Sequence, residues 1–393
     1  MPRWLVALFA ASFVFYTDDY VIAGVLPEIA RDLGVRQAAA GQLVTVFAVT
    51  VAIVAPVAGV LLARVARRAL LVTCLGVFVA ANLGALLTPS FGVLMGWRIV
   101  AAAAAAAATP SLFATAFQRA PDGKAGRYLA VVTLGVTGSI AVGVPIGTWI
   151  GGAYGWRASF AAMAVGGALA LGGLLATLPR QRPDGVVPDW RAQLRSLGRR
   201  PVAVGLLANV SLITGSMMML TYLAPFLTEV TGSGVDARAV SFGLAGVAGM
   251  AGMWGGGVAT DRWGPRRALA AGITAIAVSM GYLGVTWVVR PVPIAALLPV
   301  LAVWGAAAFW NAPAIQARLA SLTGPLAPQA LALNTSGTYL GVSLGGLAGG
   351  VALGTWGAAA LPPIAAGFAL AALAVLAAAR SQRRAPRPRR ARR

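Results

Sequence analysis

Residues 143–152 read GVPIGTWIGG, and residues 341–350 read GVSLGGLAGG. Both stretches lie in apolar surroundings, and glycine occupies the same four places in each of them. Small residues at such spacing let the backbones of neighbouring helices approach closely inside a membrane. The second stretch begins 198 residues after the first, at residue 341 against residue 143. This match predicts two halves built on one plan.

The same offset recurs in another part of the chain. Residues 59–68 read GVLLARVARR, and residues 257–266 read GVATDRWGPR, again 198 residues later. Two unrelated matches with one period predict a structural repeat. Repeats related by an axis along the membrane normal, with a binding site between them near the bilayer midplane, are a transporter architecture.

The composition indicates a membrane protein. Of 393 residues, 59% are hydrophobic and 10% are charged, whereas soluble domains carry about 25% charged residues. A hydrocarbon core about 30 Å thick needs roughly 20 apolar residues per helix. The predicted fold class is an all-α membrane protein with twelve transmembrane helices in two six-helix repeats. The spans are placed near residues 4–27, 40–62, 69–89, 91–117, 128–151, 157–178, 202–228, 238–259, 268–288, 293–317, 329–353 and 358–380.

The basic residues indicate the topology. A net charge of +21 could point to nucleic acid, but the basic side chains are nearly all Arg, located between apolar stretches and in the tail. With a cytoplasmic N-terminus, 25 Arg and Lys residues fall on the cytoplasmic side and five on the other, and Arg98 lies inside a span. Because cytoplasmic loops are enriched in Arg and Lys, both termini are expected in the cytoplasm. Nucleic acid is not expected as a partner.

The longest polar break divides the chain into parts. They are an N-terminal six-helix bundle (1–178), a cytoplasmic linker (179–201), a C-terminal six-helix bundle (202–380) and a basic disordered tail (381–393). In the linker, Trp190, Leu194 and Leu197 share one helical face, which fits a short helix on the cytoplasmic surface. A solvated linker fits equally well. The tail could contact anionic lipid.

Three charged residues, Asp18, Asp19 and Arg98, lie well inside predicted spans. A charge near the bilayer centre costs roughly 2.5 to 3.5 kcal/mol on insertion scales, so it is usually paired or functional. At a rise of ~1.5 Å per residue, Asp19 and Arg98 reach similar depths and could meet. The positions 198 residues further on, Met217 and Ala296, are uncharged. The charge is therefore confined to one half.

Two roles fit this group of charges. One acid could bind and release a proton while Arg98 adjusts its affinity, because burial favours a neutral carboxyl group and a nearby guanidinium favours an ionised one. Alternatively, a fixed ion pair tethers two helices and the second acid faces a wet cavity. Consecutive residues on a helix point about 100° apart, so one acid is expected to face Arg98.

The motifs resemble those of the major facilitator superfamily. The stretches 59–68 and 257–267 are similar to its loop signature, Gly-x-x-x-Asp-Arg-x-Gly-Arg-Arg. The second copy keeps Asp261, Arg262 and Gly264, whereas the first has Ala63 and Ala66 in place of Asp and Gly. The first copy therefore lacks the carboxylate of the signature, and an ion pair between neighbouring helix ends is not expected from it.

Further stretches resemble the twelve-span drug:proton antiporter branch, which includes chloramphenicol-resistance and sugar-efflux proteins. They are Gly143-x-Pro145-x-Gly147, the run 155–160 and the run 19–30. Arg98 matches the buried Arg of proton-coupled members, although alanines follow it. The resemblance implies that Asp19 carries the proton beside Arg98, because the family usually has its acid there, with Asp18 as the alternative.

A gating group is expected from the same motifs. Pro145 lacks an N–H and should weaken its helix, so the glycines around it could form a hinge or a close-packed seam. The carboxylate of Asp261 and the nearby guanidinium groups would lie at the inner membrane face, where they could latch neighbouring helix ends. The full set is Gly143, Pro145, Gly147, Gly151, Asp261, Arg262 and Arg266.

Aromatic, Met and amide side chains are expected to line the substrate cavity. Such groups suit an apolar or weakly polar ligand, and Met adapts to varied shapes. Taken singly, each fits helix packing better than ligand contact, and only the set favours a drug-like compound over a sugar. The set is Tyr20, Met218, Tyr222, Trp310, Asn311, Gln316, Asn334 and Tyr339.

The predicted function is proton-coupled export of a small apolar or amphipathic compound, such as a chloramphenicol-like drug, by alternating access across a bacterial inner membrane. The chain has no His and no Walker motif for ATP, so no cofactor, metal or catalytic residue is expected. A monomer is expected to suffice. The alternatives are efflux of a sugar, nucleoside or amino acid and, from another class, a membrane enzyme or a non-transporting sensor.

Overall fold

The structure is a computed structural model that describes residues 1–62, 64–179, 200–323 and 327–384. The N-terminal half contains α1 (Arg3–Asp32), α2 (Gln37–Ala40), α3 (Gln42–Leu61), α4 (Arg67–Leu86), α5 (Phe91–Gln118), α6 (Ala125–Gly138), the π-helix η1 (Ser139–Gly143), α7 (Val144–Tyr154) and α8 (Trp156–Thr177). The C-terminal half contains α10 (Arg200–Thr221), α11 (Leu223–Thr231), α12 (Val235–Trp263), α13 (Pro265–Val288), α14 (Ile294–Thr323), α15 (Ala327–Trp356), the short 3-10 helix η3 (Ala358–Ala360) and α16 (Leu361–Arg384).

The predicted spans are confirmed. In the described chain, twelve helical segments are long and apolar enough to cross a membrane. The predicted seventh span differs in detail, because α10 ends at Thr221 and the separate helix α11 follows it. At the other end, α16 continues to Arg384, into the predicted tail. The linker with its predicted surface helix around Trp190, and residues 385–393, lie outside the described residues.

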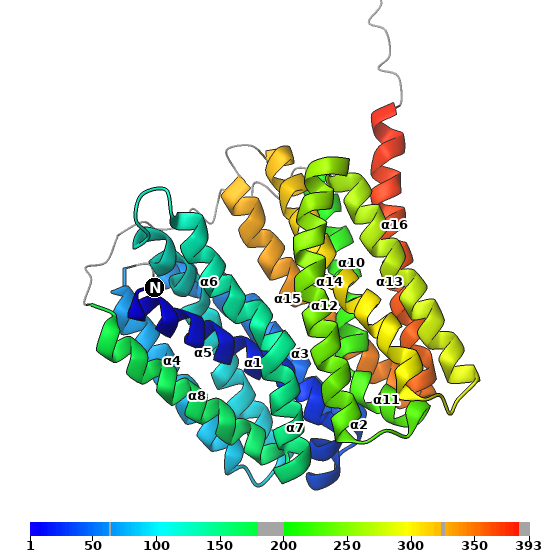
Figure 1. Ribbon diagram of the computed structural model, residues 1–393, viewed down its shortest axis with the longest axis horizontal. Helices are drawn as coiled ribbons and strands as arrows, with labels where there is room; N and C mark the ends of the chain where they lie inside the picture. Colours follow the sequence, from blue (N-terminus) through cyan, green and yellow to red (C-terminus); the bar gives the residue numbers. More distant parts are fainter. Residues whose placement is uncertain (63, 180–199, 324–326, 385–393) are drawn as a thin grey trace, which may run out of the picture.

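The two halves form two helix bundles that lie side by side (Figure 1). The start of α1 and the end of α16 point to the same side of the molecule, and α2, α7 and α11 lie at the opposite end. Between the halves, α3 packs against α15, and η1 with α7 packs against α12. These contacts join the second span to the eleventh and the fifth span to the eighth. Because the second and eighth spans are equivalent in the repeat, as are the fifth and eleventh, the two contacts are equivalent to each other.

The glycines that revealed the repeat form close helix contacts. A Cβ at Gly143, Gly147 or Gly151 would collide with Thr17, Val21 and Val25 of α1, respectively. In the other half, a Cβ at Gly341, Gly345 or Gly349 would collide in the same manner with α10. The predicted close-packed seam is therefore present in both halves, because only glycine lets these backbones approach so closely.

The helix around Pro145 is locally irregular, as predicted. The segment Ser139–Gly143 is a π-helix, and α7 begins immediately after it. Proline removes one backbone donor and crowds the carbonyl group of the preceding turn, and a π-helical turn accommodates such a break. Across this break, Gly246 of α12 lies against the backbone of Ile140 and Ala141. The irregular turn thus lies at the contact between the halves.

The two copies of the loop signature make different turns. Gly264 has a φ of 79° and connects α12 to α13, a conformation that favours glycine. Ala66, at the equivalent place in the first half, has a φ of −57°. The first turn therefore does not require glycine, which explains why alanine is accepted there.

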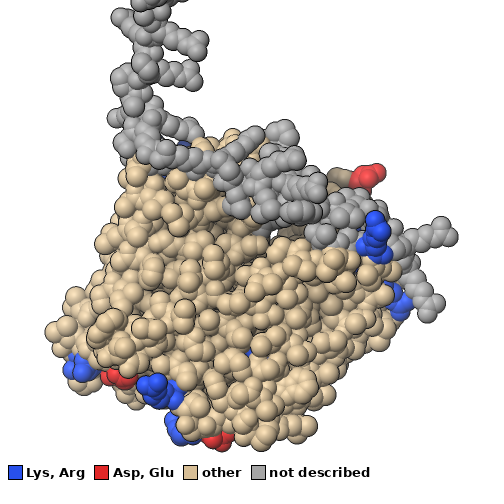
Figure 2. Space-filling model, turned by 180° about the vertical axis from the view of Figure 1, so that it is seen from behind, with Lys and Arg blue, Asp and Glu red and all other residues tan. Residues whose placement is uncertain are grey.

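The surface fits a bilayer. In the view of Figure 2 the middle of the face carries no blue or red side chains, which gather at its lower edge and its upper right. Large aliphatic side chains such as Leu169 and Val278 are mostly exposed. Such an uncharged band is what lipid tails cover.

Replacing Gly252 of α12 with Ala is expected to lower the thermal unfolding temperature of the purified protein. The added Cβ would collide with the backbone carbonyl of Ala306 in α14, and overpacking typically costs about 1 to 3 kcal/mol. Gly257→Ala in the same helix is the control, because a Cβ there meets nothing within 4 Å. Equal unfolding temperatures for the two variants would contradict this role of the close contact.

Candidate functional site

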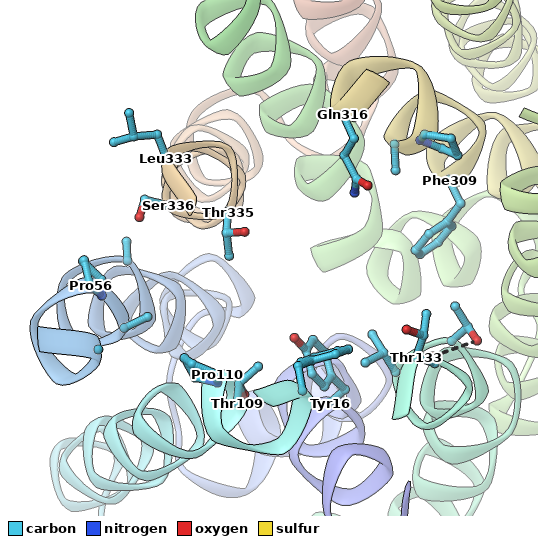
Figure 3. A pocket seen from close by; sticks show the side chains of 18 of the residues that line it. Tyr16, Pro56, Thr109, Pro110, Thr133, Phe309, Gln316, Leu333, Thr335 and Ser336 are labelled. Carbon is cyan, nitrogen blue, oxygen red and sulfur yellow. Dashed lines mark hydrogen bonds between the residues drawn. The ribbon is translucent and has the colours of Figure 1, made fainter. Parts of the chain in front are cut away.

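A large cavity lies between the two halves. Its volume is about 1200 Å³, and Figure 3 shows side chains of both halves facing each other across it. The N-terminal half contributes residues of α1, α3, α5 and α6, and the C-terminal half residues of α12, α14 and α15. The lining, which lies within the described chain, includes no charged side chain. It includes the last turn of α3, so the cavity extends toward the side of the chain termini.

A smaller recess of about 70 Å³ adjoins this cavity. The two share Tyr16, Thr109 and Thr335 among their lining residues. Asp19 lines the recess together with several aromatic side chains: Phe15, Tyr16, Phe47 and Tyr339. The recess therefore carries one acidic group in otherwise uncharged surroundings.

The buried Arg98 pairs with Asp18. One guanidinium nitrogen lies 2.7 Å from Asp18 Oδ2, and another donates to the Asp18 backbone carbonyl at 3.1 Å. Both side chains are almost completely buried, at 1% and 0% exposure. The guanidinium also lies over the Phe47 ring, 4.4 Å from its centroid. This pair ties α1 to α5 inside the N-terminal half.

The expectation that Asp19 faces Arg98 is therefore wrong. The glycine seam sets the rotation of α1, because Thr17 and Val21 must face Gly143 and Gly147. With about 100° between consecutive residues, Asp18 then points to α5 and Asp19 to the recess. This geometry matches the second of the two roles predicted from the sequence, in which one acid forms a fixed ion pair and the other faces a cavity.

Asp19 has a different kind of partner. The hydroxyl of Tyr339, on α15 of the opposite half, donates to Asp19 Oδ2 at 3.4 Å. Asp19 Oδ1 has no hydrogen-bond partner among the described residues. The carboxyl group is 2% exposed. It is thus an under-satisfied acid at the boundary between the halves.

The predicted substrate residues divide into two groups. Gln316 lines the large cavity and Tyr339 lines the recess. Met218 and Tyr222 are completely buried and pack against Gly349 of the α15 seam. Tyr20 packs on the hydrophobic cluster that both halves share and is not among the lining residues.

The remaining predicted contacts hold the C-terminal half together. The Trp310 indole donates to the carbonyl of Ala268 at 2.9 Å. Asn311 is buried and donates to Ala307 of its own helix. The Asn334 side chain accepts from Asn209 of α10 at 3.1 Å. These groups act in helix packing. From the sequence, each residue considered alone fits this role better than ligand contact.

The sequence did carry a signal for two lining residues that were not predicted. Tyr16 precedes Asp19 by nearly one helical turn, and Thr109 follows Arg98 by three turns, so each lies on the same helix face as a charged residue. Other lining side chains carry no such mark, among them Phe113, Met253 and Phe309.

The end of the molecule opposite the termini is held closed by two contacts between the halves. Arg238 of α12 forms a two-pronged ion pair with Glu28 of α1, one of whose distances is 3.3 Å. In the second contact, Gln42 of α3 donates to the hydroxyl of Tyr222, which lies between α10 and α11, at 3.4 Å. The same hydroxyl donates to the carbonyl of Gly346 in its own half at 2.9 Å. We call these two contacts the outer seal.

The predicted latch at the opposite membrane face is not formed. Asp261, Arg262 and Arg266 are exposed, and none of them has an ion pair to another described residue. Their gating role stays a prediction for a conformation in which the cavity is closed at this end. Ala63, the first-half counterpart of Asp261, lies outside the described residues.

Two repeated helix bundles with a cavity between them are a transporter architecture. The family model described as Major Facilitator Superfamily matches residues 8–325. The chain belongs to this superfamily, and its family and relatives are transporters.

Relatives by sequence cover much of the chain. The MFS-type transporter YbcL of Bacillus subtilis is 33% identical, over 88% of both chains. A chloramphenicol resistance protein of Streptomyces lividans is 34% identical, over 67% of this chain and 68% of its own. The inner membrane transport protein YdhP of Escherichia coli O157:H7 is 31% identical, over 97% and 96%.

Solved structures share the fold at lower identity. A D-xylose-proton symporter superposes with a TM-score of 0.75 at 18% identity, covering 95% of this chain and 96% of its own. A bacterial homologue of the human lysosomal transporter Spinster, in an inward-facing, unoccupied conformation, gives a TM-score of 0.71 at 19% identity, covering 96% and 95%. These likenesses show the fold.

Arg98→Gln is expected to destabilise the protein strongly, because it leaves the Asp18 carboxylate buried without its partner, typically at a cost of about 3 to 5 kcal/mol. Adding Asp18→Asn should recover most of the loss, because no buried charge then remains. Thermal unfolding of the single and double variants measures this. A double variant as unstable as Arg98→Gln would contradict the assignment of the pair.

Glu28→Gln is expected to loosen the outer seal, whereas Glu28→Arg combined with Arg238→Glu should restore it by exchanging the charges. The reporter is Ala38→Cys in a Cys74→Ala background, since Ala38 lies at the Tyr222 hydroxyl. A membrane-impermeant maleimide should label it several-fold faster in Glu28→Gln. Equal labelling rates in all three backgrounds would show that the ion pair does not close this end.

Proposed function

We propose that this transporter exports a small apolar or amphipathic compound in exchange for protons. The observation that carries the proposal is Asp19, a buried and under-satisfied acid in the recess that adjoins the large cavity. A group of this kind in a cleft is a candidate for proton binding. Among the described residues, no other charged side chain lines either space.

The cavity lining favours an apolar or amphipathic substrate. Its side chains are mainly aliphatic and aromatic with scattered hydroxyl groups, and Gln316 is the one amide among them. Ligand pockets of this kind fix orientation with a few polar groups. Recognition of a sugar, nucleoside or amino acid would need more hydrogen-bonding groups, because polar groups of the ligand left unpaired cost binding energy.

The predicted topology supports the proposal of export. With both termini in the cytoplasm, as the Arg and Lys distribution predicts, the cavity extends to the cytoplasmic side and the outer seal lies on the other. A proton bound to Asp19 from outside would leave inward as the substrate enters. The membrane potential supplies about 2.3 kcal/mol per charge per 100 mV, which is enough to drive such an exchange.

The chloramphenicol resistance protein of Streptomyces lividans makes chloramphenicol the first compound to test. The inner membrane protein YdhP supports a bacterial inner membrane as the location. The cavity is formed within one chain, so we propose that a monomer suffices.

Asp19→Asn is expected to abolish chloramphenicol uptake driven by a pH gradient into everted membrane vesicles, because the amide cannot exchange a proton. Exchange of unlabelled for labelled chloramphenicol should persist, since it needs no net proton movement. Asp236→Asn, an exposed acid at the start of α12, is the matched control and should behave as wild type. Unchanged gradient-driven uptake in Asp19→Asn would refute the proton-coupling role of Asp19. Counterflow of labelled sugar without chloramphenicol uptake would refute the substrate class.

A further inference from the structure

The two acids of α1 differ in which half of the molecule holds them. Arg98, on α5 of the same half, donates hydrogen bonds to the Asp18 carboxylate and to the Asp18 backbone carbonyl. Asp19 receives its hydrogen bond from Tyr339, on α15 of the opposite half. A movement of one half against the other would therefore leave the Asp18 pair intact and change the surroundings of Asp19.

Tyr339 reaches across the boundary between the halves. Tyr339 is the one partly buried hydrophobic side chain of the described C-terminal half that packs against the hydrophobic cluster of the N-terminal half. Its ring enters the recess beside Tyr16 and Phe47. The residue thus belongs to the C-terminal half by its helix and to the N-terminal half by its contacts.

The backbone of Tyr339 is fixed to its own half. Asn334 and Thr338, which precede Tyr339 on α15 by five residues and by one residue, accept hydrogen bonds from Asn209 of α10, each at 3.1 Å. Two residues later, Gly341 packs on the backbone of Val210 in the same helix. A rigid movement of the C-terminal half therefore moves the Tyr339 hydroxyl relative to Asp19.

We propose that Tyr339 is the positioning residue through which the C-terminal half controls proton binding at Asp19. The inference rests on the proposed function, in which Asp19 carries the proton. A hydrogen bond donated to a carboxylate stabilises its ionised form. In the conformation seen here, Tyr339 therefore promotes release of the proton into the cavity. When the halves rearrange and the hydroxyl withdraws, Asp19 loses its donor and binds a proton more readily.

The other titratable and charged groups around Asp19 do not provide this control. Asp18 and Arg98 are paired with each other inside the N-terminal half. Tyr16 and Tyr20 lie on α1 itself, so they move with Asp19. From α3 the recess is lined by Phe47, Val51 and Ala55, and none of these side chains has a donor. Tyr339 is the group that comes from the moving half.

The test is the pH titration of the Asp19 carboxyl group, read by infrared difference spectroscopy of protein in lipid. The protonated-carboxyl band is identified as the one that Asp19→Asn removes. In Tyr339→Phe its midpoint should move to higher pH by about 0.3 to 1 pH unit, which corresponds to a two- to tenfold tighter proton affinity. Tyr282→Phe, which removes a hydroxyl that donates to Ala296 elsewhere in the same half, should leave the midpoint unchanged.

The outcomes separate this inference from the proposed function. If no titrating band is lost in Asp19→Asn, the proton-carrying role of Asp19 fails. If the band is present and Tyr339→Phe leaves its midpoint in place, or if Tyr282→Phe shifts it equally, the role of Tyr339 is overturned. The optimum pH of gradient-driven uptake should shift in the same direction as the band.

Discussion

Close contact between helix backbones is the constraint on which the rest of the structure depends. Lipid tails are as apolar as leucine side chains, so helices in a bilayer gain little by hiding apolar surface and associate through tight packing instead. Here the fifth and eleventh spans supply rows of glycines, against which α1 and α10 pack so closely that a single added Cβ would collide. These seams fix the rotation of α1, and that rotation decides what each of its two acids faces.

The two halves share a backbone plan but have different polar interiors. In the N-terminal half, the buried polar centre is the ion pair of Asp18 and Arg98. In the C-terminal half, it is a neutral group in which Asn209 donates to Asn334 and Thr338. A charge inside a bilayer is costly and is usually retained for function or paired. The proton chemistry therefore resides in one half, and the other contributes a hydroxyl group to it.

The outer seal reflects the repeat as well. The pair of Glu28 and Arg238 joins the first span to the eighth, and the contact of Tyr222 with Gln42 joins the seventh to the second. The first and seventh spans are equivalent in the repeat, as are the second and eighth, so these two contacts occupy equivalent positions. One position carries an ion pair, and the other carries neutral hydrogen bonds. Both contacts are made of a few polar bonds. Such contacts can be exchanged for water when the end opens, which a fully apolar interface cannot do at so little cost.

The amino-acid sequence determined the twelve spans and the twofold plan, because a helix that crosses lipid must be long and apolar and must satisfy its own backbone. It also identified the three intramembrane charges and the close-packed glycines. The tertiary structure alone decided that Asp18 pairs with Arg98 while Asp19 contacts Tyr339. A rotation of α1 by about 100°, the angle between consecutive residues, would be enough to change which acid faces Arg98. It likewise placed Met218, Tyr222 and Asn334 in packing contacts rather than in the cavity. Cavity lining depends on how two bundles tilt against each other, and no local pattern in either bundle records that tilt.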